Sequence, residues 1–552
     1  MTKSPLVRDT VYGLVEGSET AGTYSWKGIP FAKPPVGPLR WKAPVEPDAW
    51  AGTRPAKTFG PSSSQYGRLY GPGANNRYDE TIGETLNQAV GSEDCLTLNI
   101  WRPAHNERDL PVIYFIYGGS NVSGYTADPL YDGANLAKAA NAVVVTANYR
   151  LGILGWLNMP ALKTGDDPLS DSGNFGTLDQ IQVLKFIQRN IANFGGNPGN
   201  ITVMGESAGA TNTFSLLTSP VVVETRPALF HRAVPLSGGL GTAADLPPDS
   251  IPIILPDAYS QAQSAKLLTS LLIADGKAAD DEAATAYAAT LSNAQTADYM
   301  RSKSPAELFK QLLTKLVPAG LGGTSHIADG TVVANTPIAA IKAGKYMKVP
   351  VLAGNTKDEG RLFFHFLAVW PKPGGKSAMR ISDADRFKLM IHYDPDAAPT
   401  VTLSDLIEPS YLPIDAPETG YHARLAQFGE RLFENNSDAI LNALKAMQPE
   451  VWHYRFDWDK EPAPWNDVYG AVHLLDLFFV FGNFGPSLLS NVIGGKANES
   501  GRLALSAVMM KSVGAFARTG DPNTPELGMN WPAWPKQLHF DASLTDKQIS
   551  VS

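Results

Sequence analysis

The sequence has very little cysteine, no long apolar run and no concentration of basic charge. Cys95 is its single cysteine, so no disulfide can form between two residues of this sequence, which fits a reducing compartment. No segment reaches the roughly 18 consecutive apolar residues of a membrane span, and the first residues lack the apolar stretch of a signal peptide. With 46 basic and 54 acidic residues the net charge is −8. We therefore expect neither a membrane nor a nucleic acid as partner.

The composition is that of a large folded protein. Hydrophobic residues make up 43% of the 552 residues and charged residues 18%, which is enough apolar material for a substantial core. The 50 glycines and 42 prolines predict many turns and long structured loops, where functional residues are often carried. A length prior of roughly 150 residues per domain suggests three or four domains. The motifs do not support that count.

The pattern of apolar residues predicts an α/β protein. Short β-branched and aromatic runs at the start of the chain indicate antiparallel strands. Continuous apolar runs, typical of strands buried on both faces, follow at 110–119, 142–152 and 201–209. Apolar residues at helical spacing between the second and third runs predict a βαβ unit of a parallel sheet. Helices are expected over 259–313, and further strands at 349–360 and 451–458.

We expect a single α/β domain over residues 1–552 that carries long insertions, because no repeat or low-complexity linker divides the chain. The stretch 58–91 is rich in proline, glycine, serine and asparagine, and the stretch 364–425 has little periodicity. Both are predicted to be irregular insertions that wall a pocket.

The most specific motif is GESAG at 205–209, which lies between a predicted strand and a predicted helix. The spacing G-x-S-x-G suits a sharp strand-to-helix turn, where side chains at the flanking positions would collide with neighbouring structure. Ser207 would then stand clear of the sheet, with the amino-terminal end of the helix behind it to favour negative charge. An ordinary turn serine is the alternative, and the strand and helix on either side favour a nucleophile.

A glycine-rich loop, YGGSNVSG at 117–124, follows the first buried strand. Backbone N–H groups in such a loop can stabilise the oxyanion that forms when a serine attacks a carbonyl group. A plain connecting loop is the alternative, but the position upstream of the serine motif favours an oxyanion loop.

An acid and a base are expected after the serine, in the order Ser, Asp or Glu, His. Asp358 and Glu359 both follow a predicted buried strand, and their spacing leaves the choice between them open. Of the nine histidines, His473 is the best candidate for the base. It follows the last predicted strand of the sheet, 451–458, and stands at the start of a very apolar segment. His453 lies within that strand and is interpreted as a structural histidine.

Many ordered segments resemble those of a known family: GIPFAKPPVGPLRW, SEDCLTLNIW, YGGSNVSG, NYRLGILGWL, GNFGTLDQ, FGGNPGNITVMGESAGA, GNTKDEGRLFF, AVHLLDLFFVFGN and FARTGDPN. Through them nearly the whole chain resembles the type-B carboxylesterase and cholinesterase family, and in particular its bacterial para-nitrobenzyl esterase-type members. The resemblance implies the α/β-hydrolase fold, with a large, mostly parallel central sheet, helices on both faces and loop and helical insertions that wall the active site.

The resemblance implies a serine carboxylesterase that hydrolyses carboxylic esters through an acyl-enzyme, with Ser207 as nucleophile, Glu359 as acid and His473 as base. It implies oxyanion donors at the backbone N–H groups of Gly119, Ser120 and Ala208. Supporting positions are Gly118, Ser237 and Asp476. Substrate contacts are expected at Glu206, Asn121, Val122 and Leu475. We expect a small-molecule ester as partner and neither a metal nor a cofactor, and the choice between monomer and dimer stays open.

The sequence departs from the family pattern at several positions. Ser120 stands where many relatives have a third glycine, and Asn121 where an aromatic residue is common, which leaves open how bulky an alcohol the site admits. Asp476 stands where glutamate is usual. Cys95 matches a cysteine that forms a disulfide in secreted relatives, but its partner is missing. That loss predicts a cytoplasmic, bacterial protein.

Two other functions are compatible with the same fold. Triad chemistry does not determine the leaving group, so the chain could be specialised for a carbamate, an amide, or a xenobiotic or toxin ester. A non-catalytic recognition domain of the cholinesterase type is the second alternative. Such members usually lack the nucleophile, whereas this sequence keeps all three triad positions, so a serine carboxylesterase is the predicted function.

Overall fold

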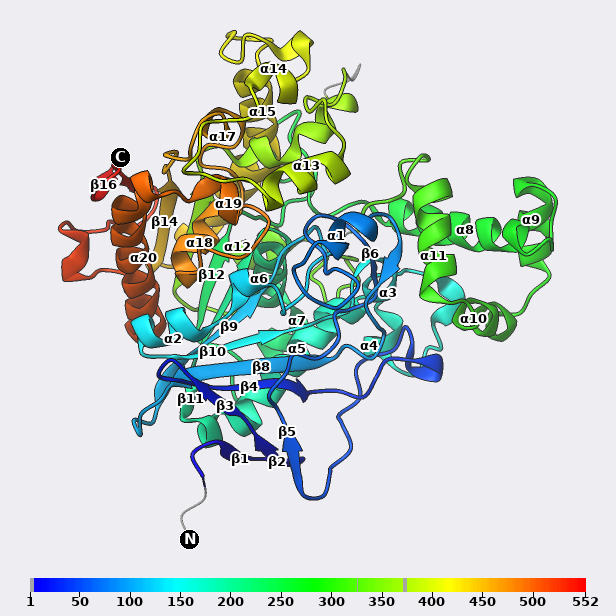
Figure 1. Cartoon of the computed structure of the whole chain (residues 1–552). Helices are drawn as coiled ribbons and strands as arrows, with labels where there is room; N and C mark the ends of the chain where they lie inside the picture. Colours follow the sequence, from blue (N-terminus) through cyan, green and yellow to red (C-terminus); the bar gives the residue numbers. More distant parts are fainter. Residues whose placement is uncertain (1–3, 325, 371–374) are drawn as a thin grey trace.

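The computed structural model of the chain describes residues 4–324, 326–370 and 375–552. Its centre is one large sheet with helices on both faces (Figure 1). The strands follow one another across this sheet in the order β16 (Lys547–Val551), β15 (Leu538–Ala542), β14 (Val451–Phe456), β13 (Val351–Thr356), β12 (Arg232–Leu236), β11 (Gly196–Glu206), β9 (Leu110–Ile116), β10 (Val143–Ala147), β8 (Thr97–Pro103), β4 (Thr23–Pro30) and β3 (Ser18–Thr20). Neighbours from β15 to β10 are parallel, and the outer pairs are antiparallel. The predicted α/β-hydrolase architecture is confirmed.

The central strands form where the sequence has continuous apolar runs. Every residue of β9 and β10 is buried, as expected for strands covered on both faces. Helix α5 (Phe175–Asn190) connects β10 to β11 and confirms the predicted βαβ unit, with β9 lying between these two strands in the sheet. Helix α6 (Ala208–Thr218) follows β11 and packs on β11 and β12. Helices α2 (Ala134–Ala140), α18 (Leu475–Phe481) and α20 (Glu499–Thr519) pack against one another.

The predicted helical region after β12 contains α8 (Asp257–Ala274), α9 (Asp281–Ala289), α10 (Asn293–Arg301) and α11 (Pro305–Gln311). These helices project to one side of the sheet in Figure 1. Leucines and aromatic residues of α8 and α11 pack with Trp41 and Phe175 into a hydrophobic cluster separate from the main core. Within the described part of the chain, no helix combines the length and apolarity that crossing a bilayer requires.

The two predicted insertions contain short elements. The stretch 58–91 holds β6 (Gln65–Tyr66), α1 (Thr81–Glu84) and β7 (Ala89–Val90). The stretch 364–425 holds the end of η6 (Glu359–Ala368), α13 (Asp383–Ile391), α14 (Leu403–Leu406) and the start of α15 (Tyr421–Gly429), while its residues 371–374 lie outside the described residues. This second insertion is therefore more helical than its weak periodicity predicted. Local capping helps to form these helices, since the Ser382 side chain accepts the Asp385 N–H at the start of α13.

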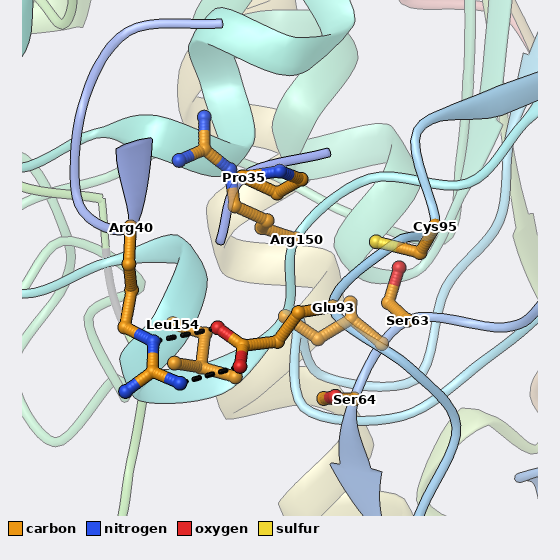
Figure 2. A pocket seen from close by; sticks show the side chains of 9 residues that line it. Pro35, Arg40, Ser63, Ser64, Glu93, Cys95, Arg150 and Leu154 are labelled. Carbon is orange, nitrogen blue, oxygen red and sulfur yellow. Dashed lines mark hydrogen bonds and ion pairs between the residues drawn. The ribbon is translucent and has the colours of Figure 1, made fainter. Parts of the chain in front are cut away.

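Cys95 lines a small pocket beside β8, shown in Figure 2. Its volume is about 10 Å³, which leaves room for at most one water. Arg40 donates two hydrogen bonds to Glu93 across this cavity, of 2.6 and 2.5 Å. Burial raises the pKa of the Cys95 thiol to about 12, so the thiol stays protonated near neutral pH.

Candidate active site

Ser207 occupies the junction between β11 and α6 in a backbone conformation that is rare for serine, with φ of 57° and ψ of −121°. The flanking glycines are required because no space exists for a side chain. A Cβ atom at Gly205 would lie 2.2 Å from the carbonyl oxygen of Gly209, and one at Gly209 would lie 2.0 Å from the carbonyl oxygen of Ile116. The GESAG motif therefore forms the sharp strand-to-helix turn that its spacing predicts.

The glycine-rich loop after β9 lies against this turn. A Cβ atom at Gly118 would come within 2.8 Å of the Ser207 Cβ. Gly119 and Ser120 have φ of 99° and 57°, so the loop bends sharply beside the serine. Among the described residues no acceptor is found for the N–H groups of Gly119, Ser120 and Ala208, and none of these residues is buried. These three free N–H groups are available to bind a negatively charged oxygen.

His473 and Glu359 form a close, buried pair. The Nδ1 atom of His473 donates to Oε2 of Glu359 over 2.5 Å. The second oxygen of Glu359 accepts from the backbone N–H of Thr356 over 2.9 Å and from the Asn355 side chain over 3.1 Å. Burial acts to raise the pKa of Glu359, but His473 and the hydrogen-bond donors outweigh it and lower that pKa. Glu359 is therefore a carboxylate that binds one ring nitrogen of His473 and orients the imidazole.

Asp358, the neighbour of Glu359, has a different contact. Its Oδ2 atom accepts from the backbone N–H of Ala471 over 3.0 Å, and its Oδ1 atom pairs with Arg361 at 2.9 Å. The backbone N–H of Asp358 also donates to the carbonyl oxygen of Ala471 over 2.9 Å. Asp358 thus ties its own loop to the loop that carries His473. Of the two candidate acids, the structure brings only Glu359 to the histidine.

The Nε2 atom of His473 faces a second carboxyl group. It lies 3.1 Å from Oε1 of Glu206, and no hydrogen bond joins it to the Ser207 hydroxyl in the described part of the chain. Burial, Asp476 and Glu359 raise the pKa of Glu206 to about 8, although His473 acts in the opposite direction. Burial also acts to lower the pKa of His473, but Glu206 and Glu359 raise it above the ordinary value.

Ser237 and Asp476 lie close to Glu359 and His473. Ser237 follows β12, is fully buried, and its backbone N–H donates to the carbonyl oxygen of Gly354 over 2.7 Å. Its hydroxyl is one of the groups that lower the pKa of Glu359. Asp476 lies in α18 and accepts from the Tyr454 hydroxyl over 2.6 Å, and burial raises its pKa to about 6.

The predicted substrate contacts Asn121, Val122 and Leu475 are buried. The Asn121 side chain exchanges two hydrogen bonds with Asn212, of 3.3 and 3.0 Å. Asn212 lies in α6, one helical turn after Ala208. The two amides therefore join the glycine-rich loop to the helix that follows Ser207. Asn212 was not among the predicted site residues, and the signal available in the sequence is an amide residue in the helix that follows the serine motif.

Aromatic rings that the sequence analysis did not single out pack against the histidine. The ring centroids of Phe363 and Phe433 lie 5.1 and 4.5 Å from that of His473. Phe363 belongs to η6, and Phe433 to the helical turn η8 (Glu430–Glu434). Phe363 in turn contacts Phe366, which is 49% exposed. An apolar aromatic wall thus extends from the imidazole ring to the molecular surface.

Comparison with known proteins places the chain in a well-defined family. The family model described as "Carboxylesterase family" matches residues 4–549. A para-nitrobenzyl esterase of Bacillus subtilis is 31% identical over 98% of this chain and 95% of its own length. A fumonisin B1 esterase of Sphingopyxis macrogoltabida is 34% identical over 96% of this chain and 85% of its own length. A solved PNB esterase structure superposes with a TM-score of 0.72 at 27% identity and covers 100% of this chain and 97% of its own.

Proposed function

The chain belongs to the carboxylesterase family, and from this membership we propose that Ser207, Glu359 and His473 form its catalytic triad. The protein is a serine carboxylesterase. The main observation behind this proposal is the backbone conformation of Ser207, with φ of 57°, next to three N–H groups that have no acceptor among the described residues. Such an arrangement suits a serine that attacks a carbonyl carbon and a site that holds the resulting oxyanion.

In the proposed mechanism, His473 takes the proton of the Ser207 hydroxyl as the serine oxygen attacks the ester carbonyl carbon. The three free N–H groups bind the oxyanion of the tetrahedral intermediate, and Glu359 stabilises the imidazolium ion that has formed. The imidazolium returns its proton to the leaving alcohol as the acyl-enzyme forms. His473 then deprotonates a water molecule, which attacks the acyl group, and the acid leaves with Ser207 restored.

For this reaction the Ser207 hydroxyl has to come within hydrogen-bond distance of the Nε2 atom of His473. Burial raises the pKa of Glu206 to about 8 and the charged form of His473 acts to lower it, so the two groups titrate as a coupled pair. The aromatic wall formed by Phe363 and Phe433 favours small-molecule esters with an apolar acyl or alcohol group. Val122 and Leu475 are proposed to border that group.

We propose the cytoplasm as the site of action, because Cys95 is buried and has no disulfide partner. Fractionation of cells that produce the protein would test this location directly.

The triad is tested by Ser207→Ala, with Ser215→Ala, a change at a buried serine of the helix that follows Ser207, as the control. Ser207→Ala is expected to lower kcat on a short-chain nitrophenyl ester at least about a thousandfold and to abolish labelling by a fluorophosphonate probe. The Ser215→Ala variant should keep both activity and labelling. Undiminished turnover by a folded Ser207→Ala variant would falsify the assignment.

A further inference from the structure

A chain of hydrogen bonds extends from Glu359 into the sheet, away from His473. Asn355 donates from Nδ2 to Oε1 of Glu359 over 3.1 Å, and its Oδ1 atom lies 2.9 Å from Nε2 of His453. Both side chains are buried. β13 and β14 are parallel with Asn355 opposite Arg455, so the two-residue period of a strand puts Asn355 and His453 on the same face of the sheet.

The direction of every hydrogen bond in this chain follows from the charge on Glu359. An ionised carboxylate can only accept, so Asn355 has to turn its NH₂ group toward Glu359. The amide oxygen then faces His453, which therefore carries its proton on Nε2. Burial lowers the pKa of His453 to about 3, so the ring is neutral and has one proton to donate. The Nδ1 atom of His453 has no hydrogen-bond partner among the described residues.

This series of hydrogen bonds determines how Glu359 presents its two oxygens. Oε1 is occupied by the donors Thr356 and Asn355, which leaves Oε2 to face His473. A primary amide that loses the partner of its oxygen is free to rotate, and Asn355 would then no longer direct a donor at Oε1. We propose that His453, acting through Asn355, is a positioning residue for Glu359. This inference rests on the proposed triad.

The same series of hydrogen bonds influences the basicity of His473. The charged or titratable groups that face His453 are Glu359, Arg455 and His539. Those that face His473 are Glu206, Glu359 and Asp476. Loss of a donor to Glu359 concentrates negative charge on the carboxylate, which stabilises the imidazolium form of His473 and raises its pKa. Because the base has to be neutral, the acidic limb of the kcat/KM profile then moves to higher pH.

The test compares His453→Leu and Asn355→Leu with the unaltered protein on a short-chain nitrophenyl ester. Each variant is expected to lower kcat about tenfold with KM changed less than about twofold, and to move the acidic limb to higher pH. His453→Gln keeps an N–H donor and should recover most of the lost kcat. His326→Leu is the matched control, since His326 is also buried but packs against Trp156, and it should leave kcat and the pH profile unchanged.

A double variant shows whether the two residues act as one unit. His453→Leu combined with Asn355→Leu should lose about as much kcat as either change alone. Asn355→Asp provides a nearly isosteric variant in case the leucine changes prevent folding: it keeps the acceptor for His453 but sets a second carboxyl beside Glu359, and kcat should fall at least about tenfold. Circular dichroism and thermal unfolding verify that each variant is folded.

Wild-type kcat and pH profile in folded His453→Leu would overturn the inference, and so would losses that multiply in the double variant. If the proposed triad is wrong, the result is different, because Ser207→Ala or Glu359→Ala would then remain active. If those two variants are inactive while His453→Leu behaves like the unaltered protein, only the positioning role is wrong.

Discussion

Oε1 of Glu206 lies 3.1 Å from Nε2 of His473, the ring nitrogen that does not contact Glu359. The imidazole ring is thus held between two buried carboxyl groups, and both raise its pKa. A general base accepts a proton only in its neutral form, so the proposed reaction requires a pH above this raised pKa. We therefore expect Glu206 to help determine the pH range in which the proposed reaction runs.

Replacing Glu206 by glutamine removes the negative charge that Glu206 carries when ionised, while the side-chain volume stays nearly the same. The pKa of His473 should fall, because one of the two groups that stabilise its charged form is lost. The acidic limb of the kcat/KM profile is then expected to move to lower pH, with a severalfold gain in activity on that limb. Steady-state kinetics across the pH range measures this shift.

Glu224→Gln, a change at an exposed residue of helix α7 (Pro220–Glu224), is the control and should leave the profile in place. If the acidic limb of the kcat/KM profile of Glu206→Gln stays in place or moves to higher pH, Glu206 does not raise the pKa of His473.

The amide pair of Asn121 and Asn212 predicts a second effect on the rate. Asn212→Leu removes the link between the glycine-rich loop and α6, so the three free N–H groups are held less firmly. We expect kcat to fall about tenfold with little change in KM, since an oxyanion forms only during the reaction. Asn121→Ala should cause a similar loss, and the double variant no larger one.

Asn498→Leu serves as the control for this pair, because Asn498 is buried and bonded to backbone carbonyl groups far from the loop in sequence. It should lower the thermal unfolding temperature and leave kcat unchanged. If it lowers kcat as much as Asn212→Leu does, the loss reflects general destabilisation instead of loop position.

Replacing the acid by its amide is expected to lower kcat much more at Glu359 than at the adjacent Asp358. Glu359→Gln removes the charge that stabilises the imidazolium of His473, and kcat should fall by about 10⁴. Asp358→Asn keeps an oxygen that can accept the Ala471 N–H, so kcat should fall less than about tenfold. Kinetics of the two purified variants decides between these acids, and equal losses would contradict the assignment of Glu359.

Much of the fold could be predicted because it depends on residues that are close in sequence. The runs that became β9 and β10 are buried along their whole length and are apolar at every position except Thr146. The turn at Ser207 follows from Gly205 and Gly209, whose missing side chains leave room for neighbouring carbonyl groups. The family motifs added the triad candidates in their chain order. The helices within 364–425 were not predicted, because short capped helices have little periodicity.

By itself, the sequence determined the α/β architecture, the sharp turn that carries the candidate nucleophile and the absence of an internal disulfide. The family resemblance implied Glu359 as the acid, whereas only the tertiary structure shows which side chains face one another. Glu359 rather than Asp358 reaches His473, and His453 reaches Asn355, because the register between β13 and β14 and the approach of distant loops orient these groups. Register and loop approach depend on packing between residues far apart in the chain, which no local pattern encodes.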